Sequence, residues 1–262
     1  MLARIVTLIL AVCFSMQAET RAVLVGISKY QKLPQDLWLQ YADADATALS
    51  KLLALPQSQV TLLTNEKATT AAIRDALRGI AKASPADSVL LLVAGHGTVD
   101  SHGAYILTYD SDPENLAATA LPMAELQTLV QRDLAKAARV VFLADVCRAA
   151  TIGNLKTETV GNALEQVGED SGEMLGLMAA RPAELSIESP EFGGGHGAFT
   201  WSVLEGLSGK ADADGDGVVT AGELIDYVRG NVSRLTKGRQ HPRDFGNMDN
   251  ATKLASGKVV LP

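Results

Sequence analysis

The sequence predicts one α/β domain in which a mainly parallel β-sheet is covered by helices on both faces. Short runs of apolar, β-branched residues have the length and composition of buried strands. Segments with apolar residues at helical spacing alternate with these runs along the chain. Because continuous apolar strands that alternate with helices are typical of parallel sheets packed on both sides, these observations favour a helix–sheet–helix sandwich.

The predicted elements follow one another along the whole chain. The helix from 42 to 53 is rich in alanine and leucine and ends before Pro56, and the helix from 70 to 83 begins with a threonine cap and ends before Pro85. Strands are expected at 22–27, 60–63, 89–94, 139–144 and 174–180. Further helices are expected at 123–135, 199–207 and 224–235, and long loops at 151–172 and 190–197.

The composition indicates an ordinary globular protein. The 262 residues are 47% hydrophobic and 20% charged, which excludes a disordered or collagen-like chain. With 23 Lys and Arg against 30 Asp and Glu, the formal charge is −7. Such a chain has no broad basic field, so we expect neither a nucleic acid nor an anionic lipid surface as its partner.

Residues 1–18 are typical of a secretory signal peptide. Arg4 precedes an apolar run from 5 to 14, and small and polar residues follow up to Ala18, where cleavage is expected. The run is too short for a comfortable membrane span and no second one follows, so we expect no stable membrane insertion. An exported protein, periplasmic or secreted, is favoured. The alternative is a chain anchored through an uncleaved or lipidated N-terminus, because Cys13 lies in the run.

Cleavage there would leave Cys147 as the lone cysteine, without an internal disulfide. A lone cysteine is either a small buried apolar residue or a thiol kept for its reactivity. The strand at 139–144 runs into Cys147, and the strand at 89–94 runs into His96, which lies between two glycines that permit a tight turn. Since parallel strands end at one edge of the sheet, we expect the sulfur and the imidazole to meet there.

A cysteine beside a histidine is the arrangement that thiol catalysis requires. The thiolate is the nucleophile, and a nearby imidazole favours its formation and later protonates the leaving amine. The alternative for His96 is a loop histidine that bonds only to the backbone. Among the other histidines, His196 is the best rival base, but no comparable strand leads to it.

An acidic segment from 212 to 223 fits the twelve-residue calcium loop of an EF-hand. Acidic residues occupy places one, three and five, glycine occupies place six and glutamate place twelve. Predicted helices flank the loop, which gives a helix–loop–helix from 199 to 235. We therefore expect a calcium ion, structural or regulatory, and no organic cofactor; the alternative is an acidic surface turn. The expected ligands are Asp212, Asp214, Asp216, Val218, Thr220 and Glu223.

These blocks together resemble the caspase-like clan of cysteine peptidases, in particular the bacterial caspase and metacaspase group. The resemblance covers nearly all of residues 19–262, which we expect to form one peptidase domain that includes the EF-hand-like segment. It implies a caspase-like three-layer α-β-α sandwich. The matching segments are 21–27, 43–46, 95–97, 145–148, 196–200, 204–207 and 240–242.

The resemblance implies roles for five residues. Cys147 would be the nucleophile and His96 the general acid and base, and the backbone N–H groups of Gly97 and Cys147 would hold the oxyanion. No third orienting residue is implied. Asp45 and Asp145 match two acids of the first substrate pocket, where paired carboxylates would favour Arg or Lys. The alternative is that Asp45 decorates its helix and Asp145 simply ends its strand.

The cysteine block departs from the family pattern. Val146 precedes the cysteine, where a serine is usual, and no glycine follows Arg148-Ala149-Ala150. The leading hypothesis is an exported cysteine endopeptidase that cleaves protein or peptide substrates after basic residues. The alternatives are an impaired pseudoenzyme that serves as a calcium-binding interaction module, and a thiol hydrolase of a small amide. Self-processing within 148–173, after Lys156, is a further expectation.

Overall fold

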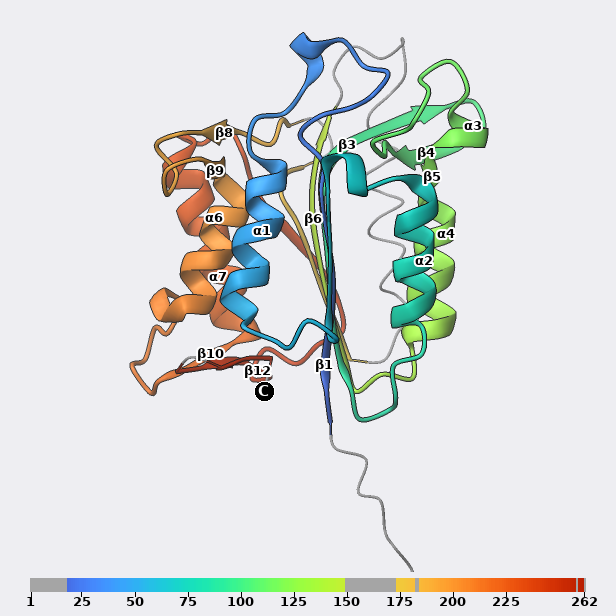
Figure 1. Cartoon of the computed structure of the whole chain (residues 1–262). Coiled ribbons are helices and arrows are strands. Elements are labelled where there is room, and N and C mark those ends of the chain that lie inside the picture. The colour runs from blue at the N-terminus through green and yellow to red at the C-terminus, as the bar shows by residue number, and fades with distance from the viewer. Residues whose placement is uncertain (1–17, 149–172, 182–183, 258, 262) are drawn as a thin grey trace, which may run out of the picture.

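The molecule consists of three layers, with a central sheet between two layers of helices (Figure 1). The structure, a computed structural model, describes residues 18–148, 173–181, 184–257 and 259–261. Almost all of the expected signal peptide, the expected loop at 151–172 and Lys156 lie outside the described residues. Within the described part of the chain, no helix has the length and the apolar composition needed to cross a membrane.

The central sheet is mainly parallel. Its main strands run in the order β11-β7-β6-β3-β1-β2, and all neighbours are parallel except β11, which is antiparallel at one edge. A further strand, β4, pairs with the end of β3 and in turn with β5. The bounds are β1 Thr20–Gly26, β2 Val60–Thr64, β3 Ser88–Asp100, β4 Gly103–Ile106, β5 Leu121–Pro122, β6 Arg139–Arg148, β7 Met174–Met178 and β11 Arg243–Gly246.

Side chains that alternate along the strands supply two separate cores. On β1, Val23 and Val25 pack into one core, whereas Ala22 and Leu24 pack into the other, as the two-residue period of a strand requires. Figure 1 shows α2 and α4 over one face of the sheet and α1, α6 and α7 over the other. The bounds are α1 Ala42–Leu53, α2 Thr70–Ile80, α4 Met123–Thr128 with its continuation η3 Leu129–Leu134, α6 Ala198–Glu205 with its continuation η5 Gly206–Lys210, and α7 Ala221–Leu235.

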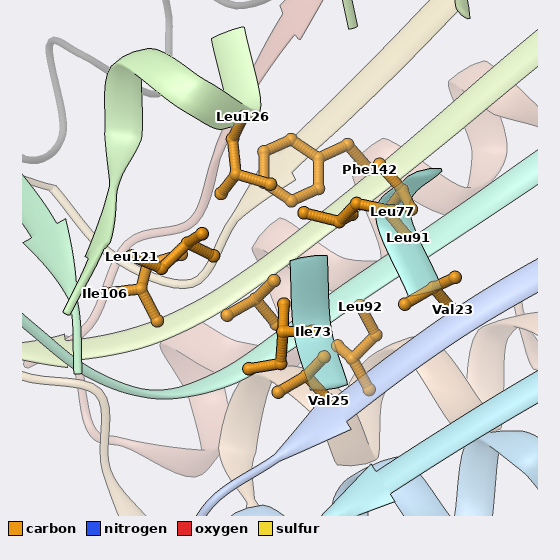
Figure 2. A pocket seen from close by; sticks show the side chains of 11 residues that line it. Val23, Val25, Ile73, Leu77, Leu91, Leu92, Ile106, Leu121, Leu126 and Phe142 are labelled. Carbon is orange, nitrogen blue, oxygen red and sulfur yellow. The ribbon is translucent and has the colours of Figure 1, made fainter. Parts of the chain in front are cut away.

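The core between the sheet and α2 contains a small cavity (Figure 2). Its volume is about 10 Å³, and its walls are apolar side chains, among them Val25, Leu77 and Phe142. A space of this size has room for about one water, and these walls offer that water no hydrogen-bond partner. We therefore regard the cavity as a packing gap and not as a ligand site.

Shorter elements lie around the main layers. Two small sheets border α6 and α7, one formed by β10-β12-β13 and the other by β8 and β9. The bounds are β8 Glu188–Ser189, β9 His196–Gly197, β10 Val218–Thr220, β12 Lys253–Ser256, β13 Val259–Val260, η1 Gln35–Leu37, η2 Asn65–Lys67 and α3 Leu116–Thr119.

The fold class predicted from the sequence is confirmed, and most elements lie where we expected them. The helix at 42–53 has the expected bounds, whereas the helix expected at 70–83 ends at Ile80. The main differences are in the two central strands, which were expected at 89–94 and 139–144 and which continue to Asp100 and Arg148. The glycines after Ala94 suggested a turn, but β4 and β6 pair with this stretch and keep it extended.

Candidate active site

The residues expected to form a catalytic pair lie on neighbouring strands. β3 and β6 pair in parallel, and their register places His96 opposite Cys147. The two backbone positions are therefore adjacent toward the carboxyl ends of the strands, the edge at which open parallel sheets bind ligands.

The chain around His96 is extended, so the prediction of a tight turn at this histidine is wrong. Gly97 pairs with Ile106 of β4 and does not reverse the chain. Gly95 meets a different requirement, because a Cβ at this position would lie 3.1 Å from the hydroxyl oxygen of Tyr30. That hydroxyl accepts a hydrogen bond of 2.8 Å from the backbone N–H of His96. The glycine thus permits a close contact that anchors the histidine.

The imidazole of His96 is buried and is held by a backbone carbonyl. Its ring stacks on that of Tyr30, with the centroids 5.1 Å apart. Nε2 lies 2.7 Å from the carbonyl oxygen of Leu37, and because a carbonyl only accepts, Nε2 must carry the proton. Nδ1 has no hydrogen-bond partner among the described residues. The orientation therefore leaves the lone pair of Nδ1 free to accept a proton.

The surroundings of His96 favour its neutral form. Burial lowers the pKa of His96, and the hydrogen bond to the Leu37 carbonyl acts in the opposite direction. A neutral imidazole with one free nitrogen is the form that a general base requires.

The carbonyl of Leu37 is an orienting group that the sequence analysis did not identify. It belongs to the segment after β1, and Asn65 fixes the start of this segment by accepting the N–H groups of Ser28 and Lys29, each at 3.0 Å. A backbone carbonyl has no signature in the sequence, because any residue at this position supplies one. Only the folded path of the chain shows that Leu37 contacts His96.

Asp45 and Asp145 converge beside one glycine. Asp45 lies on α1 and Asp145 on β6, and both are buried. A Cβ on Gly197 would lie 2.8 Å from Oδ2 of Asp145 and 3.1 Å from Oδ2 of Asp45. The structure therefore brings together the two acids that the sequence singled out, and Gly197 leaves them the space.

Asp145 is held by two hydroxyl groups. Ser186 donates to its Oδ1 at 2.6 Å and Thr200 to its Oδ2 at 2.7 Å. Gln240 is fully buried and positions Ser186, because its Nε2 donates to Ser186 Oγ at 3.3 Å and its Oε1 accepts the N–H of Ile187 at 2.9 Å. Thr200 and Gln240 belong to segments that matched the family pattern, but their contacts with Asp145 and Ser186 were not foreseen.

Asp45 is held by His196, the residue considered as a rival base. Nδ1 of His196 lies 2.7 Å from Oδ1 of Asp45, and the N–H of Gly197 lies within 3.3 Å of both carboxylate oxygens. The imidazole also stacks on Trp201, with the centroids 5.5 Å apart and the rings 11° from parallel. His196 is therefore held beside Asp45 by a hydrogen bond and by stacking on Trp201.

Burial makes the acids of this cluster hard to ionise. The pKa of Asp45 is raised to about 7. Burial is the main cause and the nearby Asp145 acts in the same direction, whereas the hydrogen bond to His196 opposes them. Burial also raises the pKa of Asp145 and that of Glu188, which accepts the backbone N–H groups of Gln40 and Tyr41. Such shifts are typical of functional sites, although buried structural acids show them too.

The loop at 212–223 brings three carboxylates together at the surface. Oxygen atoms of Asp212, Asp214 and Asp216 lie within 4.8 Å of one another. The N–H of Gly217, which has a φ of 83°, donates to Asp212 at 2.9 Å. Three convergent carboxylates suit a hard cation such as Ca²⁺.

The remaining expected ligands lie at the end of this loop. Val218 and Thr220 belong to β10. Glu223 bonds with both its oxygens to the loop, to the N–H of Ala213 at 2.9 Å and to that of Thr220 at 2.9 Å, and it forms a capping box with Thr220 at the start of α7. The three aspartates therefore form the part of the expected ligand set that lies together, whereas both oxygens of Glu223 accept backbone N–H groups of the loop.

The chain thus forms a three-layer α/β sandwich in which a histidine and a cysteine lie opposite each other on neighbouring central strands. The model of the caspase domain family matches residues 19–250, and the chain therefore belongs to this family of cysteine peptidases. No curated protein matches the sequence. Among solved structures, the crystal structure of protein GSU0716 from Geobacter sulfurreducens is similar in fold, with a TM-score of 0.62 at 18% identity over 93% of this chain and 100% of that one.

Proposed function

We propose that the protein is an exported cysteine endopeptidase that uses Cys147 and His96 as its catalytic dyad. The observation that carries this proposal is the register of β3 and β6, which sets His96 beside Cys147. The bond from His96 to Leu37 supports it further, because it leaves Nδ1 as the free basic nitrogen.

The proposed reaction follows the chemistry of thiol proteases. Nδ1 of His96 accepts the thiol proton of Cys147, and the thiolate attacks the scissile carbonyl carbon. The N–H groups of Gly97 and Cys147 stabilise the oxyanion, and the imidazolium donates its proton to the leaving amine. Water, deprotonated by the same nitrogen, then hydrolyses the thioester and restores the thiol.

The proposed specificity is for Arg or Lys before the scissile bond. Asp45 lies on α1 and Asp145 on β6, and a carboxylate oxygen of each lies close to Gly197. A cationic side chain would form charge-assisted hydrogen bonds with them, whereas an acidic side chain would be repelled.

The proposed cofactor is calcium in the loop at 212–223. Asp212, Asp214 and Asp216 would supply carboxylate oxygens, Val218 its backbone carbonyl, and Thr220 and Glu223 the remaining ligands. The ion would neutralise the acidic loop and order the helix–loop–helix that contains α6 and α7.

Two further proposals concern the parts of the chain outside the described residues. Export with cleavage after Ala18 is tested by determining the N-terminus of the mature protein. Self-processing after Lys156 is tested with the Cys147→Ala protein, which should remain uncut when purified. A variant that matures in the same way without added protease would exclude self-processing.

The decisive experiment is a cleavage profile over peptides that differ only in the residue before the scissile bond. We expect Arg and Lys peptides to be cleaved, Asp peptides to be ignored and Cys147→Ala to be inactive. Labelling of Cys147 by an arginyl chloromethyl ketone would show that the thiol is reactive. An intact, unlabelled Cys147 with no cleavage of any peptide would indicate a pseudoenzyme instead.

A further inference from the structure

We infer that His196 is a specificity-determining residue that takes the place of the substrate's positive charge beside Asp45. The bond from His196 favours the ionised form of Asp45, and the pair gives up the proton that it shares when a basic side chain binds. This inference rests on the proposed preference for basic substrates and explains how a buried acid pocket stays able to receive them.

The first argument is the geometry of the pair. Nδ1 of His196 and Oδ1 of Asp45 are 2.7 Å apart, the distance of a charge-assisted hydrogen bond. The side chain of His196 is 13% exposed and that of Asp45 is 2% exposed. The imidazole is therefore the member of the pair that solvent and a substrate reach more easily.

The second argument is the excess of negative charge around the pair. Asp145 on β6 and Glu188 on β8 are buried carboxylates of the same cluster, and Asp43 lies on α1 close enough to affect the pKa of Glu188. Asp43 accepts hydrogen bonds from Ser28 and Asn65, which are neutral side chains and bring no positive charge to the cluster. Among the described residues, His196 is the basic side chain that hydrogen-bonds to Asp45.

The third argument is the way in which the ring is held. Trp201 stacks on one face of the imidazole, and the two rings are 11° from parallel. The stack would hold the ring in place without any contact to an acid. The bond to Asp45 is therefore an additional, electrostatic feature and not merely a consequence of packing.

These contacts couple proton binding to substrate binding. With one proton, the pair of His196 and Asp45 is neutral; without it, the pair has a charge of −1 and attracts a basic side chain. The affinity for such a side chain must then rise with pH, and each bound side chain releases a proton to the solvent. Without His196, Asp45 stays protonated to a higher pH, because burial and Asp145 oppose its charge.

The test measures binding of acetyl-arginine amide to the full-length Cys147→Ala protein between pH 5.5 and 9, by calorimetry. We expect the affinity to rise with pH and protons to be released, as judged in two buffers of different ionisation enthalpy. His196→Gln should shift the midpoint of this rise upward by about one pH unit, which weakens binding about tenfold at neutral pH. At pH 9 the two affinities should converge.

His102→Gln is the matched control. This histidine also lies near an acid, with Nδ1 3.6 Å from Asp100, but it is 73% exposed and stands at the turn between β3 and β4. We expect its affinity curve to coincide with that of the parent protein. A loss of affinity in His196→Gln that is equal at every pH would overturn the inference and indicate a structural role.

A second measurement does not depend on the stability of a variant. Nitrogen-15 NMR of the imidazole of His196 in the parent protein reports its proton directly. Saturation with acetyl-arginine amide should move the titration of this ring to lower pH, and an unchanged titration would overturn the inference. If arginyl peptides are cleaved but neither readout responds, the proposed function stands without this role; if acetyl-arginine amide does not bind and no basic peptide is cleaved, both fail.

Discussion

At the level of single residues, the position of His96 depends on groups that contribute no chemistry of their own. The hydroxyl of Tyr30 accepts the backbone N–H of His96, and the ring of Tyr30 stacks on the imidazole. The carbonyl of Leu37 selects the tautomer. One contact to the backbone of His96 and two to its ring thus hold an imidazole that has no acidic side-chain partner among the described residues.

Tyr30→Phe separates these contributions, because it keeps the ring and removes the hydroxyl. The backbone N–H of His96 then loses its partner in a buried position, which should lower the free energy of unfolding by about 1–3 kcal/mol. We expect kcat to fall about tenfold, because a histidine displaced by a fraction of an ångström transfers protons poorly.

Tyr105→Phe is the control for this prediction. Tyr105 is also buried, and its hydroxyl bonds to Asp100 on the far part of the β3–β4 hairpin. Chemical denaturation should show a similar loss of stability, while peptide cleavage should be almost unchanged. Equal losses of kcat in both variants would contradict a specific role of Tyr30.

The raised pKa of Asp45 predicts that the stability of the protein depends on pH. Its pKa is raised to about 7 in the folded protein, so the folded state retains a proton that the unfolded chain releases near pH 4. This contribution makes the protein less stable as the pH rises through that window. Asp45→Asn removes this contribution. The difference in free energy of unfolding between the variant and the wild type should therefore shift in favour of the variant by on the order of 2 kcal/mol from pH 5 to pH 7.5. Chemical denaturation of the wild type and of Asp45→Asn at the two pH values measures this difference. An equal change in the free energy of unfolding of both proteins would contradict the prediction.

At the level of elements, the close approach of α1 to the end of β1 places Asp45 in the site. A Cβ on Gly26 would lie only 2.2 Å from the carbonyl oxygen of Ala42, the first residue of α1. The obstacle is backbone, which cannot rotate away. Gly26 therefore lets the helix begin directly against the strand.

Gly26→Ala should push α1 outward and destabilise the protein by about 3 kcal/mol. Gly79→Ala is the matched control, because Gly79 lies in α2 and a Cβ there has no neighbour within 4 Å. We expect this control to stabilise the protein by up to about 1 kcal/mol, since alanine favours a helix over glycine. Thermal unfolding of the two variants distinguishes the effects, and similar melting temperatures would contradict the assigned role of Gly26.

Most elements could be predicted from the sequence because their patterns are local. Apolar runs mark the buried strands, and Pro56 explains why α1 ends near Leu53. The extension of β3 past His96 could not be predicted, because it depends on pairing with β4 and β6, which are distant in the sequence. Glycine is ambiguous in such a stretch, since it suits both a turn and a close contact.

The same difference between local and long-range information applies to the candidate site. Cys147, His96, Asp45 and Asp145 could be proposed from the sequence because their side chains are chemically distinctive and follow strands or begin a helix. The carbonyl of Leu37 and the hydroxyl of Ser186 were missed, because such groups occur throughout any chain. His196 was noticed, but its partner could not be deduced without the position of α1.

At the level of the whole molecule, the acidic loop and the buried pair of Asp45 and Asp145 lie toward opposite ends of the helix that α6 and η5 form. Thr200 contacts Asp145 near the start of α6, and Asp212 follows η5. At a rise of 1.5 Å per residue, the stretch from Thr200 to the kink at Gly209 alone spans roughly 12 Å. This exceeds the screening length of about 8 Å at physiological salt, so calcium would act on the pocket through the rigidity of α6 and not through its charge.

Calcium should therefore stabilise the protein more than it changes the chemistry. With a dissociation constant of about 10⁻⁴ M, 10 mM calcium should add about 2.7 kcal/mol and raise the melting temperature by roughly 5 °C. Asp212→Asn should abolish most of this shift, while Asp75→Asn on α2 should retain it. A melting temperature that is the same with calcium and with chelator would exclude the proposed site.

The register between β3 and β6 is set by main-chain pairing in the middle of the sheet, which substitutions in peripheral segments hardly disturb. Of the groups proposed to recognise a substrate, Asp145 lies on β6 itself, whereas Asp45 and His196 come from α1 and from the hairpin of β8 and β9. Mutations in these outer segments would thus alter the preference of the proposed peptidase while the proposed dyad keeps its position, which makes this scaffold a suitable starting point for engineering new preferences.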